Sequence, residues 1–316
     1  MPSVWHECLS HAVYYAPRGR PRLMMLGESI GQRYLSSGDI LVGVLGDSGT
    51  GKSSLIGGMF PGLELTNDDE GVNVRPVPLI HMHREGRFRA HTFHIDARFE
   101  TAFAPLHEIA DAVRAALAER RRVVVEHFDE VYPLLGMNAQ FLVGIGEDIV
   151  VTRPDVFGPL PQDVARAIAG TAIYRKMAHS AEDLTAMILE QDFGIPAPVG
   201  HSDVPRGFVI EFPGPLDIDI EHVEQRALEV IRAGADIHYE DHDHVRIGDT
   251  VYPCSGPHIH VRNTSEIRCF RLVKSLVHDQ LRGTYCLVGQ VAEPRSFALV
   301  ERHPEAGEPR PAEATP

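Results

Sequence analysis

The chain has 316 residues, of which 43% are hydrophobic and 23% charged, and this length leaves room for two globular domains. The formal net charge of −14 argues against non-specific nucleic-acid binding, which depends on Lys and Arg neutralising phosphates. No apolar run is long enough to span a membrane, no secretory signal is evident, and the four cysteines lack a paired spacing, so we expect a cytoplasmic protein without disulfides or a membrane partner.

The first half is predicted to alternate strands and helices. Residues 1–38 form a mixed N-terminal preface with a helix near 22–37. The short apolar segment 39–46 is bounded by glycine and predicts a buried strand, after which a helix runs from Lys52 to Phe60. Further strands are expected at 91–97, 122–128 and 141–151, with an amphipathic helix at 102–121. This order predicts an α/β domain with a mostly parallel sheet over residues 39–165.

The second half has a different pattern. A helical stretch begins near residue 161, and we place the domain boundary at 160–172. Residues 206–220 alternate as strands do, 221–234 predict an amphipathic helix, and 236–290 predict short strands with turns. These segments indicate an α+β domain over 166–292. The Pro- and Glu-rich residues 293–316 are typical of a disordered tail.

Residues 46–53 spell GDSGTGKS and match the phosphate-binding P-loop pattern G-x-x-x-x-G-K-[ST]. Its glycines permit backbone conformations that turn successive N–H groups toward a polyphosphate, next to the N-terminus of a helix. Lys52 is expected to reach the β- and γ-phosphates, and the Ser53 hydroxyl to bind Mg²⁺. We therefore predict ATP and Mg²⁺ as ligands of nine residues: Gly46, Asp47, Ser48, Gly49, Thr50, Gly51, Lys52, Ser53 and Ser54.

Candidate acids for Mg²⁺ or for a catalytic base follow the predicted strands. VVVEHFDE at 123–130 supplies Glu126 and Asp129, and Asp96 ends another strand. An equally open alternative is that Glu126 or Asp96 caps a strand or pairs with an arginine. The GDSGTGKSS loop resembles that of P-loop kinases of the uridine-kinase type, which implies phosphoryl transfer. The chain shows no lid motif with paired arginines.

A second constellation lies at 254–267, CSGPHIHVRNTSEI, followed by CFRLV and GTYCLVG. It is similar to the second additional domain of threonyl-tRNA synthetase, the editing domain shared with alanyl-tRNA synthetase and free-standing alanyl-tRNA editing proteins. The positions that match are Cys254, Gly256, Pro257, His258, Asn263, Thr264, Ile267, Phe270 and Leu272.

The other half of that family's motif is a helical His-x-x-x-His. Its counterpart here is MAHSAEDL at 177–184, which supplies His179 and has Asp183 at the place of the second histidine. The resemblance implies that His179, Asp183, Cys254 and His258 converge, and such donors suit zinc. It also implies hydrolysis of the ester that joins a wrong amino acid to tRNA. The alternatives are that these residues position water without a metal, or that Cys254 and His258 are structural.

Three functions remain open at this level. In the first, the chain is an enzyme that combines nucleotide binding with hydrolysis or recognition of an aminoacyl ester. The amino acid of that ester is threonine-, serine- or alanine-like, and its carrier is tRNA or a smaller molecule. Alternatively, it is a nucleoside or amino-acid kinase whose second half recognises substrate, or a nucleotide-dependent tRNA or amino-acid sensor without turnover. If tRNA is bound, the basic stretch 262–282 is expected to hold its phosphates. A solvated face with scattered charge is the alternative for that stretch.

Overall fold

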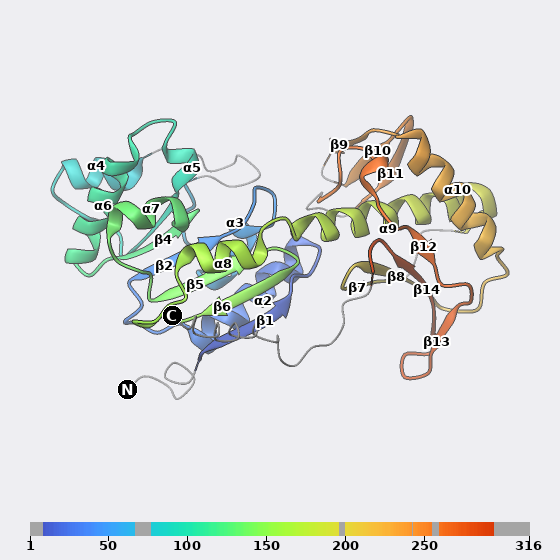
Figure 1. Cartoon of the computed structure of the whole chain (residues 1–316), viewed down its shortest axis with the longest axis horizontal. Helices are drawn as coiled ribbons and strands as arrows, with labels where there is room; N and C mark the ends of the chain where they lie inside the picture. The colour runs from blue at the N-terminus through green and yellow to red at the C-terminus, as the bar shows by residue number, and fades with distance from the viewer. Residues whose placement is uncertain (1–8, 67–76, 196–199, 242, 255–258, 294–316) are drawn as a thin grey trace, which may run out of the picture.

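The computed structural model describes residues 9–66, 77–195, 200–241, 243–254 and 259–293 in two parts (Figure 1). A helix of 22 residues, α9 (Ala172–Phe193), runs from the first part into the second. None of the helices within these ranges is long and apolar enough to cross a membrane.

The described residues of the first part form a six-stranded sheet in the order β1-β6-β5-β2-β4-β3. Its strands are β1 (His11–Tyr15), β2 (Leu41–Leu45), β3 (Thr92–Asp96), β4 (Arg122–Glu126), β5 (Phe141–Ile145) and β6 (Asp148–Thr152). The four consecutive strands β3, β4, β2 and β5 are parallel to one another. Strands β6 and β1, on the other side of β5, are antiparallel to their neighbours. The sheet is therefore mixed, and this half is α/β.

The single strand expected at 141–151 is a hairpin. The chain reverses at Gly146, whose N–H donates to the carbonyl of Asp148 over 2.8 Å, and β6 then pairs antiparallel with β5. Apolar residues continue through both strands, so the hydrophobic pattern alone does not mark the reversal.

Helices cover both faces of this sheet. They are α2 (Arg20–Tyr34), α3 (Lys52–Met59), α4 (Pro78–Arg84), α5 (Ala97–Glu100), α6 (Leu106–Ala118), α7 (Phe128–Leu135) and α8 (Pro161–Ile168). Successive side chains of a strand point to opposite faces. Leu41 and Leu45 of β2 accordingly enter the core beneath α6 and α7, while Val42 and Val44 enter the core beneath α2 and α3. Burial on both faces explains the uninterrupted apolar sequence of β2.

Residues 9–38 belong to the predicted N-terminal preface, and in the structure they are part of the first half. Strand β1 forms one edge of the sheet, and α2 packs against α3 with very close backbones. A Cβ added to Gly27 would lie 2.3 Å from the Leu55 carbonyl oxygen, and one added to Gly58 would lie 2.0 Å from that of Met24. Only glycine fits these crossings, so α2 fixes the position of the helix that follows the glycine-rich loop.

The second part is α+β, with α9 and α10 (Ile220–Ala233) packed on antiparallel strands. One sheet has the order β12-β14-β8-β7, with β13 also paired to β14, and a second has the order β11-β10-β9. The strands are β7 (Gly200–Val204), β8 (Gly207–Phe212), β9 (Ile237–Asp241), β10 (His244–Ile247), β11 (Thr250–Pro253), β12 (Arg271–Leu272), β13 (Val277–Asp279) and β14 (Thr284–Gln290). Their inward side chains and the apolar face of α9 share one core, which includes Leu184, Phe208 and Leu287.

Candidate functional site

The glycine-rich loop (residues 46–53) lies at the carboxyl end of β2 and leads directly into α3. Gly46, Gly49 and Gly51 have φ angles of 148°, 74° and 92°, a region that side chains rarely allow. Because β2 lies between its parallel neighbours β4 and β5, the loop occupies the edge of the sheet where α/β proteins bind ligands. Backbone conformation and position thus both suit phosphate binding.

Lys52, Ser53 and Glu126 meet at this edge. Lys52 Nζ donates to the Asp47 carbonyl over 3.1 Å and lies 3.5 Å from Glu126 Oε2. The Ser53 hydroxyl donates to Glu126 Oε1 over 3.3 Å. Glu126, the last residue of β4, therefore lies beside the lysine and the hydroxyl that the sequence assigned to phosphate and Mg²⁺.

His94 holds the Glu126 carboxylate from the other side. The Thr66 N–H donates to His94 Nδ1 over 3.1 Å, so Nδ1 is an acceptor and the ring proton lies on Nε2. His94 Nε2 then donates to Glu126 Oε1 over 3.1 Å. The sequence analysis did not select His94 or Thr66. They are 28 residues apart, and only the folded chain shows that they are partners.

The other candidate acids differ in position. Asp96 accepts from the Phe99 N–H over 3.1 Å and so caps the helix α5, a structural role that differs from the strand cap or arginine pair considered as the alternative. It also belongs to a group with Glu126 and His127 whose donor atoms lie within 4.8 Å of one another, close enough to share a cation. Asp129 lies in the first turn of α7, outside this group. Glu126 and Asp96 are therefore the acids best placed beside the loop.

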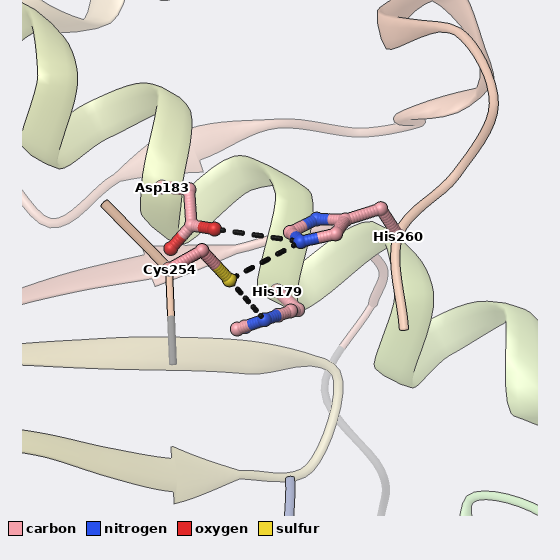
Figure 2. Close-up of side chains that lie close together, drawn as sticks. All are labelled: His179, Asp183, Cys254 and His260. Atoms are coloured by element: carbon pink, nitrogen blue, oxygen red, sulfur yellow. Dashed lines mark hydrogen bonds and ion pairs between the residues drawn. The ribbon is translucent and has the colours of Figure 1, made fainter. Parts of the chain in front are cut away.

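A second group of side chains converges where α9 meets the end of β11 (Figure 2). This His–Asp–Cys–His cluster consists of His179, Asp183, Cys254 and His260. Cys254 Sγ lies 3.3 Å from His179 Nε2 and 3.4 Å from His260 Nε2, and His260 Nε2 lies 3.6 Å from Asp183 Oδ2. Ligand atoms on a tetrahedral zinc ion, with bonds of about 2.0–2.3 Å, are separated by roughly 3.3–3.6 Å. These three distances are compatible with a tetrahedral site, and all four donor atoms lie within 4.8 Å of one another.

The helix supplies His179 and Asp183 because residues four apart share one face. Both imidazole rings also have an oxygen near the nitrogen that faces away from the cluster. His179 Nδ1 lies 3.7 Å from Glu182 Oε2, and His260 Nδ1 lies 3.2 Å from the Ser180 hydroxyl. The Ser180 hydroxyl is within hydrogen-bond distance and can fix the orientation of the His260 ring, whereas Glu182 is too far from His179 for a hydrogen bond and acts on that ring through its charge.

The Cys254 thiol is buried. Burial, and then the negative charge of neighbouring Asp183, raise the pKa of this thiol above its usual range. Zinc binds the thiolate, so a bound cation would supply the positive charge that the deprotonated sulfur needs here. The donor set of two imidazoles, a thiol and a carboxylate fits a zinc-class ion.

His260 stands where the sequence analysis placed His258. Residues 255–258, including Gly256, Pro257 and His258, lie outside the described residues. The remaining matched positions have structural roles. The Asn263 side chain caps a short helix by accepting from the Ser265 N–H over 2.9 Å, and the buried Thr264 hydroxyl donates to the Val230 carbonyl over 3.0 Å. Three apolar matches belong to the core of the second part: Ile267, Phe270 and Leu272.

The basic stretch 262–282 is partly neutralised. Arg271 lies 3.6 Å from Glu293, Lys274 lies 2.5 Å from Glu224, and Arg282 lies 3.0 Å from Glu211. Arg262 and Arg268 are exposed. Each of these acids reduces the positive potential that a phosphate backbone would meet, so the stretch offers less to tRNA than its sequence suggests.

No known protein-family model matches this chain, and no curated protein matches it either. The function must therefore be inferred from the glycine-rich loop and the His–Asp–Cys–His cluster.

Proposed function

We propose that the protein binds a Mg²⁺–nucleoside triphosphate on the glycine-rich loop and hydrolyses an aminoacyl ester at a zinc-class ion held by the His–Asp–Cys–His cluster. The observation that carries the proposal is the convergence of the four donor atoms within 4.8 Å, on residues that the editing-domain resemblance singled out or, for His260, on a close neighbour.

The nucleotide half of the proposal is a P-loop. Residues 46–54 would cradle the phosphates through backbone N–H groups, Lys52 would neutralise the β- and γ-phosphates, and Ser53 would hold Mg²⁺. Glu126 lies 3.3 Å from the Ser53 hydroxyl, so its carboxylate is placed to order the water shell of that ion. His94 keeps this carboxylate in place.

In the ester-hydrolysing half, a bound ion would polarise the ester carbonyl or lower the pKa of a water molecule. Cys254 and the two histidines supply three ligands, which is the number that leaves a position open for catalysis. Asp183, whose Oδ2 lies 3.6 Å from His260 Nε2, would orient the attacking water and accept its proton. In the editing domains that this segment resembles, a histidine takes this place, and a carboxylate can also serve as a general base.

The partial neutralisation of the basic stretch favours recognition of the aminoacyl end over extensive contact with the body of a tRNA. We therefore propose a small carrier, or the terminal nucleotide of a tRNA, bearing a threonine-, serine- or alanine-like amino acid. A pocket that hydrogen-bonds a side-chain hydroxyl would discriminate strongly against analogues without it.

The test combines elemental analysis of protein purified without chelator with assays on threonyl, seryl and alanyl esters, free and on tRNA. We expect one zinc-class ion per chain and ester hydrolysis that Cys254→Ala and His260→Ala abolish. Cys269→Ala is the matched control, because Cys269 is an exposed free cysteine and is not part of the cluster. Metal-free wild-type protein, or Cys254→Ala that hydrolyses esters at the wild-type rate, would contradict the proposal.

A small-molecule kinase is the second candidate, and one cavity favours it. The cavity has a volume of about 560 Å³, within the range of small-molecule sites, and its lining includes Met59, Phe60, Thr66, Met82, Phe93 and His94. Since His94 also binds Glu126, this cavity borders the nucleotide site and could hold a phosphoryl acceptor. ATP consumption that depends on a free nucleoside or amino acid, without ester hydrolysis, would select this function.

A further inference from the structure

Helix α9 carries residues of both candidate sites on one face. Arg175, His179 and Asp183 follow one another at intervals of four residues and so line the same side of the helix. At about 1.5 Å per residue, the eight steps from Arg175 to Asp183 span roughly 12 Å. Figure 1 shows α9 running from the first part of the molecule, where the glycine-rich loop lies, into the second part.

Arg175 fastens α9 to the glycine-rich loop. Its Nη1 donates to the Thr50 carbonyl over 2.9 Å and to the Gly146 carbonyl over 3.2 Å, and its Nη2 donates to the Pro17 carbonyl over 3.0 Å. Burial lowers the pKa of Arg175 to about 10, so the guanidinium remains charged at neutral pH. A buried charge held by three carbonyls is costly to release, which makes this a firm attachment.

A second connection leads from the same segment to the metal ligands. Arg18 follows Pro17, whose carbonyl accepts from Arg175. The Nη2 atom of Arg18 lies 3.3 Å from Glu182 Oε2. Glu182 Oε2 in turn lies 3.7 Å from Nδ1 of His179. Both side chains of the Arg18–Glu182 pair are buried, so water screens their interaction little.

The Thr50 carbonyl and the Gly51 N–H belong to one planar peptide unit and project from it in opposite directions. Arg175 therefore holds the far end of a peptide whose N–H is available to a phosphate. A polyphosphate that binds this N–H and draws Lys52 away from the Asp47 carbonyl would tilt the peptide and change its bond to Arg175.

We propose that the nucleotide loop and the His–Asp–Cys–His cluster are energetically coupled through α9, so that nucleotide binding changes the affinity for the metal ion. This inference rests on the proposed function, because both ligands must bind. Linkage requires reciprocity, so the metal ion must change nucleotide affinity by the same factor.

The experiment measures Zn²⁺ affinity by competition with a chromogenic chelator, with and without Mg²⁺ and a non-hydrolysable ATP analogue. Nucleotide affinity is measured with and without Zn²⁺. In the wild type we expect a change of about 5-fold or more, equal in both directions. Lys52→Ala under the same conditions corrects for zinc bound by the nucleotide itself.

Arg175→Lys tests the route. A single ammonium group cannot reproduce the fork that reaches carbonyls of three segments, so the coupling factor should fall toward one. Arg166→Lys is the matched control, because Arg166 is exposed on α8 and pairs only with Asp163 among the described contacts. If Arg175→Lys is unstable by thermal unfolding, Glu182→Gln serves instead, since it weakens the second connection and should also lower the factor.

Two failures are distinguishable. Wild-type protein that binds both ligands with a coupling factor of one would overturn the coupling and leave the proposed function standing. Protein that binds no metal ion, or no nucleotide, would overturn the proposed function and the coupling with it. If Arg175→Lys folds and both it and Glu182→Gln keep the wild-type coupling factor, α9 is not the route.

Discussion

Glu182 Oε2 lies 3.7 Å from Nδ1 of His179, while Nε2 of the same ring lies 3.3 Å from Cys254 Sγ. The imidazole is therefore placed between a carboxylate and the centre of the cluster. At 3.7 Å the carboxylate is beyond hydrogen-bond distance, so it acts on the ring through its negative charge, which makes the inner nitrogen a better ligand for a cation.

Replacing this carboxylate should weaken metal binding without removing a ligand. Glu182→Gln is expected to lower Zn²⁺ affinity by up to about 10-fold, the lower end of the effect of losing a hydrogen-bonded partner, because Glu182 contributes its charge and no hydrogen bond. Chelator competition measures the change. Glu190→Gln is the control, because Glu190 is an exposed residue of the same helix. Equal affinities for wild type and Glu182→Gln would mean that Glu182 does not support His179.

Lys52→Ala should weaken nucleotide binding. A hydrogen bond to a charged group contributes about 1.5–3 kcal/mol, so the affinity for ATP should fall by about 10- to 100-fold in calorimetry. The variant should fold, since Glu126 keeps its bonds to Ser53 and His94. Lys274→Ala, which loses an exposed ion pair in the second part, provides the control. ATP affinity that Lys52→Ala leaves unchanged would end the P-loop assignment.

The two histidines of PHIH can be told apart by metal content. His260→Ala should lose the ion, because His260 Nε2 lies 3.4 Å from Cys254 Sγ. His258→Ala should retain it if His260 is the ligand. Elemental analysis of both variants decides, and loss of metal in His258→Ala alone would restore the set that the sequence predicted.

The family resemblance selected His258, but local geometry does not separate it from His260. Residues two apart in an extended chain face the same side, so His258 and His260 both remain candidates for one ligand position. Spacing did locate His179 and Asp183, since a helix brings residues four apart together. The hydrogen-bond partners of Arg175 could not be predicted from the sequence for a different reason. They are backbone carbonyls, which every residue possesses, so no sequence pattern marks them.

Some features of the sheet could also be predicted from the sequence, and others could not. Short apolar runs bounded by glycine or acidic residues predicted β2, β3 and β4, because strands buried on both faces need continuous apolar sequence. The same signal could not reveal that 141–151 folds back on itself at Gly146. Nor could it show that the ionisable residue Glu100 is buried, with only 2% of its surface exposed and the Val77 N–H donating to its carboxyl group.

Glu100 carries the last prediction, a pH dependence of stability. Burial raises its pKa from 4.5 to about 7, against the opposing effect of the Val77 N–H that donates to its carboxylate. Between these two pH values the folded protein holds a proton that the unfolded chain has released, so stability falls as pH rises through this window and is level above it. A shift of this size corresponds to roughly 3 kcal/mol.

Glu100→Gln removes the titration but keeps an oxygen for the Val77 N–H. In urea unfolding the variant should exceed wild type by up to roughly 3 kcal/mol at pH 8, and the difference should vanish near pH 4.5. Glu108→Gln, at an exposed ion pair with Arg84, should show no such pH-dependent gap. A Glu100→Gln gap that is the same at both pH values would mean that Glu100 is not protonated in the folded protein.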